Sequence, residues 1–131
     1  MRRANHPGPE PRNEPGLHLF RTATLVWAIL IAWLAFRPST GLESGLPWDK
    51  ANHAAAFVAL TLLAGRGWPD LPRIALALIM LAAGVGVELV QGLPQVGRHA
   101  DVWDVVADAV GIAGGLILLA WPRRRRPGPT G

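Results

Sequence analysis

Four long, predominantly apolar segments without proline constrain the fold of this chain more than any other feature of its sequence. They cover residues 17–36, 51–68, 74–93 and 102–121. Each approaches the roughly 20 residues that an α-helix needs to cross the hydrocarbon layer of a bilayer. All 12 prolines lie outside these segments, and six mark the junctions: Pro38, Pro47, Pro69, Pro72, Pro94 and Pro122. Because proline interrupts helices, this spacing predicts four separate transmembrane helices.

A water-soluble four-helix bundle is the main alternative for a chain of 131 residues of which 50% are hydrophobic. Helices of such a bundle carry an apolar stripe and an opposite polar face. Residues 24–36 and 74–87 are instead apolar on nearly every face. We therefore expect an all-α, polytopic membrane protein whose four transmembrane helices form an up-down bundle. Its parts would be a disordered cytoplasmic leader (1–16), a transmembrane domain (17–121) and a basic cytoplasmic tail (122–131).

Arginines near the ends of the apolar segments predict the orientation of the chain. Short loops and termini that are rich in Lys and Arg stay in the cytoplasm. Such residues lie at the start of the first segment, between the second and third, and after the fourth: Arg2, Arg3, Arg12, Arg21, Arg66, Arg73 and Arg123 to Arg126. We therefore expect both termini in the cytoplasm and the connections at 37–50 and 94–101 on the outside.

The formal net charge of +4 and the pI of about 11.3 come mainly from the two ends of the chain. A nucleic-acid-binding protein would need its cations spread over a folded face, with aromatic side chains among them for stacking. The apolar segments offer no such face, so we expect no nucleic-acid partner. The absence of cysteine excludes a disulfide framework, a thiolate nucleophile and a thiolate zinc site.

Ionisable and amide side chains occur at one end of three of the segments, where the up-down topology places all of them toward the outside. An ionisable group inside a bilayer costs at least ~2.5 kcal/mol, so such groups mark candidate functional sites. Spacings of three or four residues put those of each helix on one face. The predicted ligand-binding set comprises Asp49, Lys50, His53, Glu88, Gln91, Arg98, Asp101, Asp104 and Asp108.

Negative charge exceeds positive charge in this set, because five carboxylates face only Lys50 and Arg98 as permanent cations. At low dielectric the excess carboxylates must be protonated, reach water, or share a cation, a charged His53 or a positive group of a ligand. Three glycines on the same helix faces would let the backbones approach closely enough for these groups to meet: Gly84, Gly111 and Gly115. The first segment has no comparable polar group, and we expect it to act as a scaffold.

Three motifs within this set together resemble the VanZ-like family of small integral membrane proteins. That family has a D-K-x-x-H opening, an E-x-x-Q at the end of the next span, and G-R followed by a D-x-x-x-N-x-x-G helix. The matching residues, within about residues 48–115, are Asp49, Lys50, His53, Glu88, Gln91, Gly97, Arg98, Asp104 and Gly111, whereas Asp108 stands where the family usually has Asn. The resemblance implies a multi-pass protein of the bacterial cytoplasmic membrane with a role in the cell envelope. The family has no established biochemical activity.

Three interpretations of the polar residues remain open. The first is an outward-facing site for a lipid head group, a cell-wall precursor or a glycopeptide, because the VanZ-like family is named after a member associated with reduced susceptibility to teicoplanin. The second is a structural network that fixes how the helices pack. The third is a membrane-embedded hydrolase with His53, Glu88 and Asp104 as catalytic candidates, in which His53, Glu88 and Asp108 would hold any metal ion.

The enzyme interpretation lacks a motif that supplies a nucleophile, and the sequence contains neither an H-E-x-x-H pattern nor a phosphate-binding glycine loop. The sequence therefore favours a protein that is not an enzyme, with no cofactor and no bound metal. The expected partners are the lipid bilayer and an envelope lipid or cell-wall precursor. The oligomeric state is left open.

Overall fold

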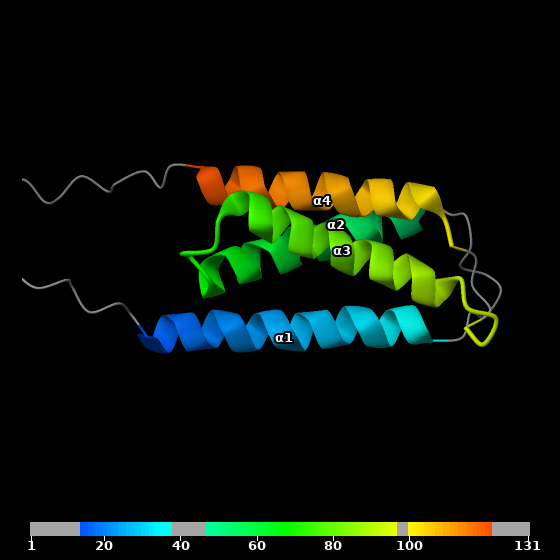
Figure 1. Cartoon of the computed structure of the whole chain (residues 1–131), viewed down its shortest axis with the longest axis horizontal. Coiled ribbons are helices and arrows are strands. Elements are labelled where there is room, and N and C mark those ends of the chain that lie inside the picture. Colours follow the sequence, from blue (N-terminus) through cyan, green and yellow to red (C-terminus); the bar gives the residue numbers. More distant parts are fainter. Residues whose placement is uncertain (1–13, 38–46, 97–99, 122–131) are drawn as a thin grey trace, which may run out of the picture.

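The computed structural model describes residues 14–37, 47–96 and 100–121, with side chains for all of them except residues 14 and 47–49. Four α-helices run alternately up and down (Figure 1): α1 (Glu14–Phe36), α2 (Pro47–Gly67), α3 (Arg73–Gln91) and α4 (Val102–Ala120). The expected all-α fold with four helices is therefore confirmed. The helices end within two residues of the predicted limits.

The largest differences from the predicted limits are at two helix starts. α1 begins at Glu14, so residues 14–16 of the predicted leader are helical. α2 begins at Pro47, four residues before the predicted segment. Both starts have the same physical reason, since proline is tolerated in the first turn of a helix and an acidic residue there is favoured by the helix dipole. The rest of the predicted leader, and the predicted tail (122–131), lie outside the described residues.

Three of the four helices are long and apolar enough to cross a membrane: α1 from Pro15, α3 and α4. Their outward faces carry large apolar side chains that are mostly exposed, such as Ile29, Leu78 and Val110, at 68%, 61% and 63% exposure. A water-soluble protein rarely exposes so much contiguous apolar surface. These features indicate a membrane protein with several spans, which associates with the lipid bilayer.

α2 is less apolar than the other three helices, so three of the four expected transmembrane spans are supported among the described residues. The physical reason lies in the polar residues at its two ends, Lys50, Asn52 and His53 at one and Arg66 at the other. α2 is also the central helix, because it packs against α1, α3 and α4 more extensively than any other helix packs against its neighbours. A helix that is enclosed by its neighbours presents less surface to lipid, and it tolerates a more polar sequence for that reason.

The apolar core lies between α2, α3 and α4, and part of α1 packs against it. Its buried members are Phe57, Leu60, Ala64, Leu76, Met80 and Ile112. The core is supplemented by close contact between α2 and α4, where glycines of α4 face the backbone of α2. A side chain at Gly111 would overlap the carbonyl group of Ala54, and a Cβ at Gly115 would lie 2.7 Å from Thr61 Cβ. This close approach of α2 and α4 brings together the polar residues at the starts of both helices.

Candidate functional site

α2 begins, α3 ends and α4 begins at the same end of the bundle (Figure 1). Polar side chains of these three helices gather there. We call this group the polar layer; its described members are Lys50, His53, Glu88, Gln91, Asp101, Asp104 and Asp108. Most are shielded: Glu88, Gln91 and Asp104 are each 5% exposed, and Asp108 is 0% exposed. Such burial is unfavourable unless the polar groups pair with one another or with a ligand.

Lys50 connects α2 to the start of α4. Its Nζ lies 2.6 Å from Asp101 Oδ2 and 3.2 Å from Asp104 Oδ1. Asp101 also caps α4, because its Oδ1 accepts a hydrogen bond from the backbone N–H of Trp103 at 2.9 Å. The hydrogen bond from Lys50 and this cap lower the pKa of Asp101 below its usual value of 3.8. Asp101 is therefore ionised at neutral pH and holds α2 and α4 together at this end.

Glu88 connects α3 to the same network. Its Oε2 accepts a hydrogen bond from the backbone N–H of Asp101 at 3.0 Å. Its other oxygen, Oε1, is buried and has no hydrogen-bond partner among the described residues. Most buried polar atoms in proteins do have a partner, so an unpaired carboxylate oxygen needs an explanation.

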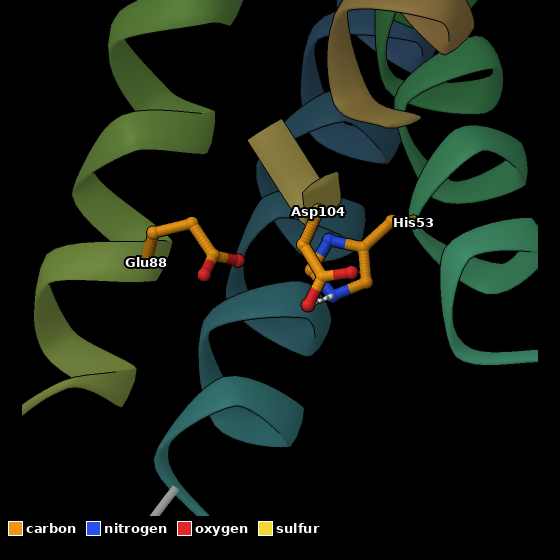
Figure 2. Close-up of side chains that lie close together, drawn as sticks. All are labelled: His53, Glu88 and Asp104. Carbon is orange, nitrogen blue, oxygen red and sulfur yellow. Dashed lines mark ion pairs between the residues drawn. The ribbon is translucent and has the colours of Figure 1, made fainter. Parts of the chain in front are cut away.

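His53 lies between two carboxylates of α4. Its Nδ1 donates a hydrogen bond to Asp108 Oδ1 at 2.9 Å, and its Nε2 lies 4.0 Å from Asp104 Oδ2. The first contact is a good hydrogen bond, whereas the second is too long to be one. The bond to Asp108 fixes the orientation of the imidazole ring and directs Nε2 toward Asp104 (Figure 2).

Three side chains of the polar layer are arranged as metal ligands could be. His53, Glu88 and Asp104 each offer one donor atom, and these atoms all lie within 4.8 Å of one another (Figure 2). The sequence predicted His53, Glu88 and Asp108 as the possible metal ligands, so the structure places Asp104 in the position expected for Asp108. The reason is that Asp108 lies one turn further along α4, where its Oδ1 pairs with His53 Nδ1.

A cavity of about 250 Å³ opens beside His53, on the side of α1. Its polar lining is supplied by Arg37, Asn52, His53 and Gln91, and apolar side chains of α1, α2 and α3 complete it. A second, almost wholly apolar cavity of about 280 Å³ lies between the same three helices. The two cavities share the lining residues Ile31, Ala35, Phe57 and Val87, so the polar cavity and the apolar one adjoin each other.

The contribution of α1 was not expected from the sequence, which suggested that this helix is only a scaffold. Arg37 directly follows α1, lines the cavity and stacks over Trp33, with 5.3 Å from its Cζ to the ring centroid. Asn52, which also lines the cavity, was missed as well. The position of Arg37 in the sequence was the one available signal. Arginines are expected at the cytoplasmic end of the bundle, and Arg37 lies at the opposite end, so membrane orientation does not explain its presence.

The structure brings together seven of the nine residues predicted to bind a ligand, including the three catalytic candidates His53, Glu88 and Asp104. Gln91 belongs to the cavity rather than to the carboxylate network. Asp49 lies in the first turn of α2, but its side chain is outside the described part of the chain, and Arg98 is outside it altogether.

Comparison of the chain with protein-family models, with curated proteins and with solved structures found no match.

Proposed function

We propose that this protein is a VanZ-like, four-pass protein of the bacterial cytoplasmic membrane that binds an amphiphile with a phosphate head group. The binding site is the pair of adjoining cavities beside the polar layer. In this proposal α2 also crosses the membrane, and both termini are cytoplasmic. The arginine content of the opposite end supports that orientation, because Arg21, Arg66 and Arg73 lie at the end of the bundle remote from the polar layer.

The observation that carries the proposal is the change in lining along the two cavities. One end offers polar side chains and the other is formed by apolar side chains of α1, α2 and α3. Their volumes of about 250 and 280 Å³ are each just below the roughly 300–1,000 Å³ that is typical of ligand pockets. A molecule with a polar head and a hydrocarbon chain matches this change of lining.

Charge complementarity favours an anionic head group. Arg37, Asn52 and Gln91 can all donate hydrogen bonds into the polar cavity, and no carboxylate is among its described lining residues. Arginine binds phosphate oxygens through two parallel hydrogen bonds. A phosphate fits these donors, and both a phospholipid and a lipid-linked cell-wall precursor carry one.

The polar layer also argues against a purely structural role. A network that served only helix packing would pair its buried oxygens, since each unpaired group costs about 1–3 kcal/mol. Glu88 Oε1 and Asp108 Oδ2 are buried without a hydrogen-bond partner among the described residues. Buried polar atoms without a partner are typical of a ligand-binding site.

Arg37→Gln should weaken binding of a phosphate-bearing amphiphile at least ~10-fold, because a charge-assisted hydrogen bond contributes about 1.5–3 kcal/mol. Native mass spectrometry of the purified full chain can measure this with phosphatidylglycerol in one arm and a polyprenyl phosphate in the other. Arg66→Gln is the matched control, because it removes the same charge at the opposite end of the bundle.

The preferred amphiphile distinguishes a phospholipid from a cell-wall precursor as the source of the phosphate. A neutral diacylglycerol should bind poorly to the wild-type protein. Equal binding of diacylglycerol and phosphatidylglycerol, or unchanged binding in Arg37→Gln, would contradict the proposal.

A further inference from the structure

We propose that His53, Glu88 and Asp104 form a binding site for a divalent transition-metal ion such as Zn²⁺, and that Asp108 orients His53 for this purpose. The site lies within the polar layer, on the side where α3 and α4 face α2 (Figure 2). It shares His53 with the amphiphile cavity but goes beyond that proposal, because it requires no amphiphile.

The unpaired oxygen of Glu88 is the first observation that points to a ligand. Glu88 is only 5% exposed, and its Oε1 has no hydrogen-bond partner among the described residues. Figure 2 shows its carboxylate extending from α3 toward Asp104 and His53. A buried carboxylate directed at a second carboxylate is unfavourable, and a cation between the two removes the repulsion.

The second observation is the orientation of His53. Metal-binding histidines almost always donate their other ring N–H to a carboxylate or carbonyl group, which fixes the tautomer and strengthens the ligand. His53 has this arrangement, since Nδ1 contacts Asp108 Oδ1 at 2.9 Å while Nε2 faces Asp104. Asp108 therefore takes the orienting role, and Asp104 takes the role of a ligand.

The distance between His53 Nε2 and Asp104 Oδ2 is the third observation. At 4.0 Å the two atoms are too far apart for a hydrogen bond. Two atoms that each lie about 2.0–2.2 Å from one Zn²⁺ ion can be no more than about 4.4 Å apart, so one ion can reach both. Asp104 Oδ1 is meanwhile held by Lys50 at 3.2 Å, which directs Oδ2 toward His53.

The charge and the chemistry of the donors identify the kind of ion. Among the described side chains of the polar layer, four carboxylates face Lys50 as the one permanent cation, so a divalent ion reduces an excess of negative charge. An imidazole with two carboxylates favours zinc, manganese or iron(II) over the oxygen-only ligand sets of Ca²⁺ and Mg²⁺. Three protein ligands leave a further coordination position for water or substrate.

Equilibrium dialysis followed by elemental analysis tests the proposal on the full chain in detergent, after chelation and without any added amphiphile. The wild-type protein should take up about one Zn²⁺ per chain at micromolar free Zn²⁺. X-ray absorption spectroscopy of that sample should show one imidazole in an otherwise oxygen coordination shell. Absence of uptake, or a shell without imidazole, would overturn the proposal.

Two substitutions assign the ligands. Loss of an orienting partner typically weakens metal binding by ~10–100-fold, and Asp108→Asn should weaken Zn²⁺ binding by an amount within that range. Glu88→Gln and Asp104→Asn each remove a ligand and should weaken Zn²⁺ binding by more than that. Asp70→Asn is the matched control at the opposite end, and its binding should equal that of the wild type. Retention of full binding in both ligand variants would mean an adventitious site and overturn the assignment.

The metal proposal and the amphiphile proposal can fail separately. Zn²⁺ uptake is measured without amphiphile, and amphiphile binding is measured on chelated protein. Far-ultraviolet circular dichroism of each variant shows whether its helices are intact. If Glu88→Gln and Asp104→Asn both unfold, the imidazole signal of the wild-type protein still decides the outcome.

Discussion

Gly111→Ala is expected to destabilise the bundle by about 1–3 kcal/mol, the usual range for adding a carbon to a tightly packed position. The new Cβ would overlap the backbone carbonyl group of Ala54. A backbone atom of a central helix cannot rotate away as the end of a flexible side chain can, so α2 and α4 would have to separate. The separation would also disturb the contacts of Lys50 and His53 with α4.

Gly114→Ala is the matched control, because it makes the same change three residues later on α4. Its Cβ would meet only Val58 Cγ2, at an ordinary contact distance of 3.5 Å. This variant should be neutral, or stabilised by up to about 1 kcal/mol through the higher helix propensity of alanine. Reversible unfolding in mixed detergent, followed by circular dichroism, measures both variants. Equal stabilities would show that α2 and α4 are not in close contact at Gly111.

Asp108→Ala is the second substitution with a large expected effect, a loss of about 3 kcal/mol in the free energy of unfolding. Asp108 is 0% exposed, and its Oδ1 pairs with His53 Nδ1 at 2.9 Å. Removing the carboxylate leaves a buried imidazole without this partner and opens a gap against Gly84. Gln95→Ala, at an exposed turn, should change the stability by no more than about 0.5 kcal/mol.

A double-mutant cycle of Asp108→Ala with His53→Ala separates the contact from the general effect of a cavity. The two changes should be non-additive by about 0.5–3 kcal/mol, because the contact between the two side chains is already lost in either single variant. Additive effects would mean that the contact between His53 and Asp108 contributes nothing to stability, and the orienting role of Asp108 would then be unsupported.

Much of the fold could be predicted from the sequence because it depends on local rules. The prolines between the apolar segments fixed the helix limits to within a few residues, with the exceptions at Glu14 and Pro47. The position of the polar layer at one end of the bundle followed from the regular rise of each helix in an up-down arrangement. The close contacts of Gly84, Gly111 and Gly115 were likewise expected, since small residues shared a face with the polar residues.

The remaining features depend on how the helices are arranged around one another, which no local pattern reveals. The central position of α2 explains its polar sequence, but the same sequence also fits a helix at an edge. The choice between Asp104 and Asp108 as the neighbour of Glu88 depends on the rotation of α4 against α2. The role of Arg37 depends on how α1 packs against α2 and α3, and α1 has no periodic polar signal that predicts its contacts.

The central claim is that all four helices cross the membrane and that the polar side chains at their ends lie on one side of it. Because the chain contains no cysteine, single cysteines at Arg37, Gln95 and Asp70 can be labelled with a membrane-impermeant maleimide on intact cells. Our account predicts labelling of Arg37→Cys and Gln95→Cys from outside, and labelling of Asp70→Cys only after permeabilisation. Arg37→Cys and Gln95→Cys on opposite sides would show that α2 does not cross, and would contradict the account.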